Sequence, residues 1–84
     1  MSYRLLLDLE VYDFLAALTA KERGQLRRRF QELQEAPGAW QEIETRDSNG
    51  RLLWMSICGR FAITFWEDFP DRQIKVLRIT LADR

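Results

Sequence analysis

The stretch that decides the fold of this chain is Gly59-Arg60-Phe61-Ala62-Ile63-Thr64-Phe65-Trp66. Its large apolar residues alternate with Arg60, Ala62 and Thr64, which is the period-two pattern of a strand with one buried face. One strand-like run precedes this stretch, another follows it, and two helical patterns lie upstream. We therefore predict a strand over residues 60–66 that belongs to a sheet covered on one side by helices.

Length and composition predict a single domain over residues 1–84. A chain of 84 residues is close to the size at which one hydrophobic core is only marginally sufficient. Hydrophobic residues make up 46% of the chain, which is enough for a core without disulfides or metal, and we expect no cofactor. The 13 basic and 13 acidic residues cancel, so any basic binding site must be local.

Several classes of chemistry and location are excluded by residues that the chain lacks. Histidine is absent, which excludes His-based acid–base catalysis, His-activated nucleophiles and His-ligated metals. The single Cys58 cannot form an internal disulfide, and its apolar neighbours indicate a small buried hydrophobe. No apolar run approaches the roughly 20 residues of a membrane span, and no signal peptide is recognisable. We therefore expect a cytoplasmic protein with no membrane partner.

The first half of the chain predicts a strand followed by two helices. Tyr3–Leu7 is a nearly continuous apolar run, typical of a strand covered on both faces. Asp8 can cap a first helix, whose apolar residues over 11–18 have helical spacing. Thr19-Ala20-Lys21-Glu22 matches a capping box that starts a second helix, and Pro37-Gly38 ends it. The two helices therefore form a hairpin that needs an apolar surface to lie on.

The second half changes to period two and predicts the sheet. Asn49-Gly50 is a strong turn signal, Gly59 marks a tight turn or bulge, and Glu67–Arg72 makes a further reversal. The predicted strands are a short edge strand over residues 40–45 and three longer ones over residues 51–58, 60–66 and 73–81. The fold class is thus α+β: a strand, a two-helix hairpin, then antiparallel strands forming a twisted sheet.

Five short motifs, taken in order and spacing, point to a known family. They are the opening Tyr3–Leu7, the phrase Asp13-Phe14-Leu15 before Leu18, the helix Leu26–Leu33 closing on Glu35-Ala36-Pro37, the strand start Cys58–Ile63, and the run Val76–Ile79. Through them the chain resembles the RelE/ParE toxin superfamily from Tyr3 to Arg84. The resemblance implies a toxin-like component of a bacterial type II toxin–antitoxin pair, bound by an antitoxin protein. It also implies either cleavage of ribosome-bound messenger RNA, as in RelE-like members, or action on DNA gyrase, as in ParE-like members.

The sequence departs from the RNA-cleaving pattern at one position. The family's strand carries an arginine three residues after its glycine, and counting from Gly59 reaches Ala62. A guanidinium would stabilise the charge that develops on a cleaved phosphate, which a methyl group cannot do. We therefore favour a toxin that acts mainly through protein–protein binding, with a degraded nuclease site. The alternatives are a messenger RNA-cleaving ribonuclease with an altered basic site, and a small structural or adaptor domain.

The candidate residues of an altered site are basic. Arg60, which strand alternation directs to the same side as Ala62, and Arg84, which matches a C-terminal basic residue of the family, are the candidate catalytic groups. We expect Arg60 and Arg84 to converge at one end of the sheet with Arg72, Arg78 and Asp83. Independent surface ion pairs are the alternative. The candidate partner- or RNA-binding residues are Arg51, Arg72, Arg78, Asp83, Trp54 and Trp66.

Three further clusters have a functional and a structural interpretation. The second helix carries basic residues dispersed around its circumference, typical of a solvated face rather than a phosphate-binding stripe: Lys21, Arg23, Arg27, Arg28 and Arg29. The acidic segment 66–71 could hold a hard cation, but a polar hairpin loop is favoured. Of Trp40, Trp54 and Trp66, at least one is expected in the core, whereas an exposed one would mark a partner groove.

Overall fold

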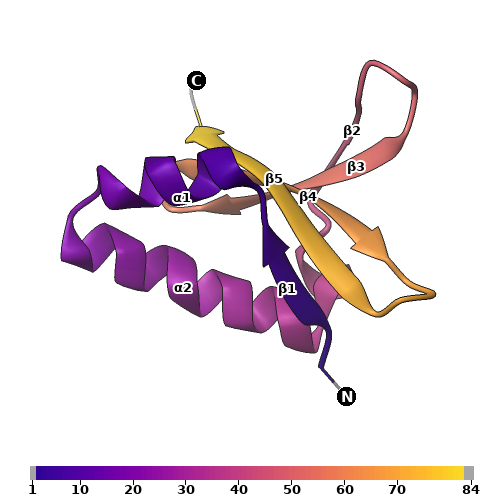
Figure 1. The fold of residues 1–84 in the computed structure, drawn as a ribbon, viewed down its shortest axis with the longest axis horizontal. Helices are drawn as coiled ribbons and strands as arrows, with labels where there is room; N and C mark the ends of the chain where they lie inside the picture. The colour runs from indigo at the N-terminus through magenta and orange to yellow at the C-terminus, as the bar shows by residue number, and fades with distance from the viewer. Residues whose placement is uncertain (1, 83–84) are drawn as a thin grey trace.

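The computed structural model describes residues 2–82, in which two helices pack on one side of a five-stranded sheet (Figure 1). The elements are β1 (Arg4–Leu7), α1 (Leu9–Ala16), α2 (Ala20–Glu35), a 3-10 helix η1 (Pro37–Trp40), β2 (Ile43–Arg46), β3 (Leu52–Cys58), β4 (Phe61–Asp68) and β5 (Gln73–Leu81). The α+β fold class is thereby confirmed. Among the described residues, neither helix combines the length and the apolarity that crossing a bilayer requires.

Both helices begin where the capping residues predict. The Asp8 carboxylate accepts the Leu9 N–H at 2.8 Å. Thr19 and Glu22 form the reciprocal capping box, with the Glu22 N–H donating to the Thr19 hydroxyl at 3.2 Å and the Glu22 carboxylate accepting the Thr19 N–H at 3.1 Å. The α1–α2 connection is closed by Arg23, whose guanidinium donates to the Leu18 carbonyl at 2.5 Å. The hairpin geometry is therefore fixed by local hydrogen bonds.

The sheet has the strand order β1-β5-β4-β3-β2, with β1 parallel to β5 and all other pairs antiparallel. Parallel strands need a long connection between them. The helical hairpin and the three middle strands provide this connection between β1 and β5. The prediction that Tyr3–Leu7 is covered on both faces is wrong. β1 is an edge strand whose exposure alternates, with Arg4 and Leu6 exposed and Leu5 and Leu7 half-buried against the helices.

The prediction of a single buried face for residues 60–66 is also wrong, because β4 is the central strand. Phe61, Ile63 and Phe65 face the helices, as expected, but Ala62 and Thr64 on the other face are only 2% and 4% exposed. In the register, Ala62 lies between Ile57 and Thr80, and Thr64 lies between Met55 and Arg78. These longer neighbours cover the small side chains without any help from a helix.

The hydrophobic core lies between the helices and one face of the sheet. Its fully buried side chains include Val11, Leu26, Leu33, Phe61, Ile63, Phe65, Ile74 and Val76. Phe14 of α1 meets Phe61 edge-on, with ring centroids 5.8 Å apart. Cys58 is buried in this core, as predicted, and its burial raises the pKa of the thiol.

The predicted strand over residues 40–45 begins later than expected. Trp40 ends η1 and packs against the core, and β2 starts at Ile43. The turn at Asn49-Gly50 is present, with Gly50 at φ +82°. Asp47 supports this turn, since its carboxylate accepts the N–H groups of Asn49 and Arg51 at 2.9 and 2.8 Å. These hydrogen bonds hold the pKa of Asp47 below its usual range, the bond from Arg51 having the largest effect.

Candidate functional site

The face of the sheet opposite the helices, called the open face here, carries a polar groove of about 390 Å³. The side chains that line it come from β2, β3, β4, β5 and the β2–β3 turn: Thr45, Arg46, Asp47, Ser48, Leu53, Met55, Thr64, Arg78 and Thr80. The Arg78 side chain is exposed and forms no ion pair or hydrogen bond within residues 2–82. An unpaired guanidinium beside four hydroxyl side chains provides donors suited to a phosphate or another anion.

Trp66 lies on the same open face, within reach of two cations. The Arg51 guanidinium lies 4.6 Å from the centroid of the Trp66 ring, and the Lys75 ammonium lies 4.7 Å from it. Lys75 is opposite Trp66 in the β4–β5 register. Basic groups around an aromatic ring are the combination that single-stranded nucleic acid binds, through phosphates and base stacking.

Lys75 and Arg78 share the open face because β5 contains a bulge. The β4–β5 register passes from Thr64↔Arg78 to Phe65↔Val76, so that Leu77 is an additional residue. In a strictly alternating strand, positions 75 and 78 would point to opposite faces. Sequence reasoning therefore missed Lys75, and only the register shift reveals it.

The open face is basic but poor in groups for proton transfer. Four cations contribute to it (Arg46, Arg51, Lys75 and Arg78), although Arg46 is paired with Glu44 at 3.5 Å, and Asp47 is the acidic residue of the groove lining. The low pKa of Asp47 makes it a weak base, and its Oδ2 lies 3.8 Å from the Arg51 side chain. A general base works best with a pKa near neutral pH, and the groove lining contains none. The arrangement therefore suits binding of an anion better than its cleavage.

Arg60 does not point to the open face, contrary to expectation. It precedes β4 in the turn after Gly59, where strand alternation does not apply. Its guanidinium donates to the Glu22 carboxylate of α2 at 2.6 and 3.1 Å, on the helix side of the sheet. This contact holds the pKa of Glu22 below its usual range. Arg60 therefore does not replace the guanidinium missing at Ala62.

The predicted convergence of arginines at one end of the sheet is wrong for the described residues. Phe61 pairs with Leu81, whereas Asp68 pairs with Gln73, so Arg60 and Arg72 lie at opposite ends of β4. Arg72 has a left-handed backbone (φ 54°) and its guanidinium lies 5.2 Å from the centroid of the Tyr3 ring and 6.0 Å from that of Phe69. Arg78 lies between these ends, in the groove. The remaining members of the predicted cluster, Asp83 and Arg84, lie outside the described residues.

The two candidate tryptophans lie on opposite faces. Trp54 is opposite Phe65 and packs against the core beneath the helices, as Trp40 does. Trp66 alone of the three lies on the open face. The expectation of at least one core tryptophan is confirmed, and Trp66 is the half-buried tryptophan of the open face.

The basic residues of α2 divide into structural and exposed ones. Arg29 donates to the buried Ser56 hydroxyl at 2.7 Å and to the Ile57 carbonyl at 2.9 Å, and stacks on Trp40 at 3.9 Å. Arg23 closes the helical hairpin, as described above. Three others are exposed and form no ion pair within residues 2–82: Lys21, Arg27 and Arg28. The interpretation as a uniformly solvated face is therefore correct for only part of this set.

The acidic turn after Trp66 uses its carboxylates in hydrogen bonds. Glu67 accepts hydrogen bonds from the Tyr3 hydroxyl at 2.8 Å and from the Gln41 amide at 2.6 Å. The hydrogen bond to Glu67 raises the pKa of Tyr3. Asp68 accepts the Asp71 N–H at 3.4 Å. In the part of the chain that the structure describes, no three Cys, Asp or Glu side chains are grouped as metal ligands.

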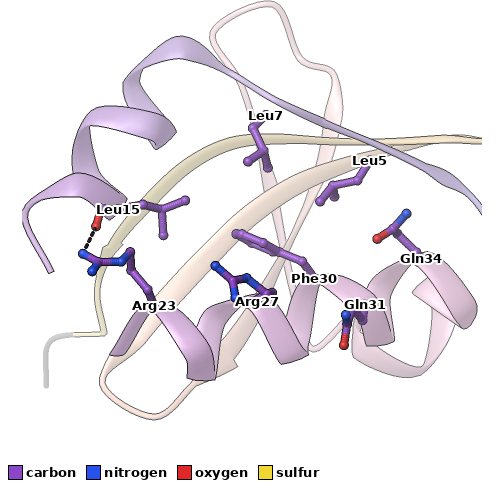
Figure 2. A pocket seen from close by; sticks show the side chains of 8 residues that line it. All are labelled: Leu5, Leu7, Leu15, Arg23, Arg27, Phe30, Gln31 and Gln34. Atoms are coloured by element: carbon purple, nitrogen blue, oxygen red, sulfur yellow. Dashed lines mark hydrogen bonds between the residues drawn. The ribbon is translucent and has the colours of Figure 1, made fainter. Parts of the chain in front are cut away.

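A second, apolar cavity of about 350 Å³ lies between β1, α1 and α2 (Figure 2). Leu5 and Leu7 of β1, Leu15 of α1 and Phe30 of α2 form its walls. Arg23, Arg27, Gln31 and Gln34 provide its polar groups. Sequence reasoning missed this cavity because it treated Tyr3–Leu7 as an inner strand. No local signal pointed to it, because Leu5, Leu6 and Leu7 are all apolar and only their burial in the folded protein alternates.

The fold described here is that of the RelE toxins. No family model matches the sequence, and no curated protein matches it either. The structure is similar to the archaeal RelE–RelB complex from Pyrococcus horikoshii, with a TM-score of 0.83 and 18% identity over 100% of this chain and 99% of that one. It is also similar to the RelBE2 complex of Mycobacterium tuberculosis, with a TM-score of 0.81 and 13% identity over 96% of this chain and 99% of that one. A third similar structure is the intact RelBE complex of E. coli, with a TM-score of 0.76 and 17% identity over 99% of this chain and 100% of that one.

Proposed function

We propose that this chain is the toxin component of a toxin–antitoxin pair and that a protein antitoxin binds and controls it in the cytoplasm. The observation that supports the proposal most is the extent of the structural match, which spans 96–100% of this chain in three complexes described as RelE–RelB or RelBE. The open face and the apolar cavity also provide surfaces for a target and for a partner.

The open face binds the target, and catalysis is weak or lost. Ala62 leaves the central strand β4 without a guanidinium at this position of the open face, and Arg60 is held on the helix side by Glu22. Losing one donor that stabilises transition-state charge costs about 10²–10³ in rate. Within residues 2–82, the one carboxylate of the groove lining is Asp47, whose pKa lies below its usual range. Inhibition by binding is therefore favoured over turnover.

Induced expression in bacteria tests this function. The chain is expressed alone and together with the product of the neighbouring reading frame, and growth and co-purification are measured. Arrest that the neighbour relieves, with a stable complex of the two proteins, is the expected result. A chain that neither arrests growth nor binds the neighbour would refute the toxin assignment and leave a structural or adaptor domain.

The second candidate function is binding of single-stranded RNA, with residual cleavage, by an altered basic site. Trp66 between Arg51 and Lys75, together with the unpaired Arg78, favours it. The Arg78→Ala variant should weaken binding of a fluorescent RNA oligonucleotide and reduce the salt slope by about 0.7. Arg28→Ala removes another exposed arginine, from the helix side, and serves as the control.

Comparing these two variants also separates the targets. If arrest requires Arg78 and transcripts are cut, the protein is a ribonuclease with an altered site. If arrest requires Arg78 without cleavage, it inhibits by binding RNA. Arrest that is indifferent to Arg78→Ala, with no affinity for RNA, would point to a protein target such as gyrase.

A further inference from the structure

The outer edge of β2 is an open edge of the sheet. β2 is the last strand on its side of the sheet and pairs with β3 alone among the described strands. Figure 1 shows the β2–β3 hairpin extending away from both helices. Three of its four residues, Ile43, Glu44 and Arg46, are exposed. An exposed edge of this kind is a template on which another strand can pair.

Two residues of β2 direct their main-chain groups outward. The Asp47 N–H donates to the Arg51 carbonyl at 3.1 Å, so these two residues form a hydrogen-bonded pair next to the turn. Because such pairs alternate along an antiparallel ladder, the main-chain groups of Thr45 also point to β3. Those of Glu44 and Arg46, at the alternate positions, point away from β3. No strand within residues 2–82 lies on that side to receive them.

The same two residues carry opposite charges that the protein uses little. The side chains of Glu44 and Arg46 are 56% and 58% exposed, and they contact each other at 3.5 Å. An exposed ion pair at this distance contributes little to stability. Arg46 also donates to the Gly50 carbonyl at 2.9 Å through its other terminal nitrogen. Since each terminal nitrogen of a guanidinium carries two N–H groups, Arg46 keeps donors for another chain.

An antiparallel copy of β2 matches these charges in one register. Outward-pointing residues must pair with outward-pointing residues, because only their main-chain groups are available. Pairing centred on Thr45 places Glu44 of each copy opposite Arg46 of the other. The neighbouring registers are centred on Glu44 or on Arg46, and each places two like charges opposite each other. Charges on an edge normally disfavour pairing, but in the register centred on Thr45 they attract.

We propose that the β2 edge binds a second copy of this chain by antiparallel β2–β2 pairing centred on Thr45. Each Glu44–Arg46 pair exchanges two main-chain hydrogen bonds and adds a cross-strand ion pair. Two-fold symmetry produces every contact twice, as in other isologous dimers. The two five-stranded sheets thereby become one continuous sheet. This dimer does not depend on the function proposed above.

The pairing also extends the polar groove of the open face. Thr45 lines this groove and lies on the two-fold axis of the dimer. The axis that relates two antiparallel neighbours is perpendicular to the sheet, so the open faces of both copies lie on the same side. The two grooves therefore meet at Thr45, and the cations of both open faces form one basic surface. An anion longer than one groove would contact both copies.

Exchanging the two charges tests the proposal. Sedimentation velocity at increasing concentration should show the unmodified chain passing from monomer to dimer. Glu44→Arg alone, or Arg46→Glu alone, places like charges opposite each other and should weaken the dimer about tenfold. The double variant Glu44→Arg/Arg46→Glu restores opposite charges and should dimerise like the unmodified chain. Arg28→Glu changes an exposed arginine of α2 and should leave the dimer unaffected.

A mixture of the two single variants provides a second test. The Glu44→Arg chain carries two arginines on its edge, and the Arg46→Glu chain carries two glutamates. The mixture should therefore form a mixed dimer at concentrations where each variant alone is a monomer. Circular dichroism of each variant checks that the fold is retained. A mixture that associates no better than its components would overturn the proposal.

Amide hydrogen exchange, resolved by residue, locates the interface. The Glu44 and Arg46 amides should exchange fast in dilute protein and slow by at least about tenfold where the dimer forms. The Thr45 amide should exchange slowly at both concentrations, because it points to β3. A chain that stays monomeric at every concentration would overturn the proposal. A dimer in which the Glu44 and Arg46 amides remain fast would assign the association to another surface, and would overturn it too.

Discussion

Removing the Arg29 side chain should destabilise the protein far more than removing the neighbouring Arg28. Arg29 donates to the fully buried Ser56 hydroxyl at 2.7 Å and to the Ile57 carbonyl at 2.9 Å, and it lies over the Trp40 ring at 3.9 Å. In Arg29→Ala, the Ser56 hydroxyl loses its partner inside the protein, which costs about 1–3 kcal/mol. The lost carbonyl bond adds about 1 kcal/mol and the lost stacking about 0.5–1 kcal/mol.

These contributions add up to about 2.5–5 kcal/mol, and we take about 3 kcal/mol as the loss in the free energy of unfolding. For a domain of this size, 1 kcal/mol shifts Tm by about 4–8 °C, so the expected fall in Tm is about 12–24 °C. Urea unfolding followed by tryptophan fluorescence and far-UV circular dichroism measures the difference. Arg28 is exposed and unpaired within residues 2–82, and Arg28→Ala should change stability by no more than about 0.5 kcal/mol.

A double-mutant cycle with Ser56→Ala locates the effect. Since the two side chains bond to each other, their coupling energy should be about 1–2 kcal/mol. If Arg29→Ala costs no more than Arg28→Ala, or if the cycle with Ser56→Ala gives no coupling, then α2 is not held to β3 by this contact and the structural interpretation of Arg29 is refuted.

Three other predictions concern the turn after β3 and its surroundings. Gly59→Ala should cost about 1–2 kcal/mol in thermal unfolding, because φ is +61° and a Cβ would approach the Gln25 amide to 2.5 Å; an unchanged Tm would contradict this. Arg60 lowers the pKa of Glu22, so the ion pair stabilises the fold at pH values above the ordinary carboxyl pKa. This stabilisation is lost as the pH falls through the lowered pKa of Glu22. Glu22→Gln should therefore lower Tm at pH 7 and leave it unchanged at about pH 2. The buried Cys58 thiol, with its raised pKa, should react with an alkylating reagent only as fast as the protein unfolds, and rapid alkylation without urea would count against its burial.

The elements that the sequence predicts well are those whose signals are local. A capping box places its own side chains on its own backbone, so Thr19 and Glu22 start α2 without any tertiary contact. The same applies to the cap at Asp8 and to the turn at Asn49-Gly50. Element order along the chain follows from these signals together with the change from helical to strand periodicity.

The candidate site was predictable only in part. Arg51, Arg78 and Trp66 do lie together on the open face. The prediction for Arg60 is wrong because this residue belongs to a turn, in which side chains do not alternate between two faces. The cavity beside β1 was missed because nothing local distinguishes an edge strand from an inner one in so short an apolar run.

The sequence by itself determined the helices, the turns and the class of fold, because hydrogen bonds between near neighbours and hydrophobic periodicity encode them. It also established that position 62 lacks a guanidinium, whatever the tertiary structure is. Which strands lie at the edges and which residues share a face depends on contacts between segments that are distant in the sequence. The additional residue Leu77 in β5 shows why: it reverses the alternation and brings Lys75 and Arg78 to the same side. A bulge depends on pairing with β4, and such pairing between distant segments is not visible in the order of residues along one strand.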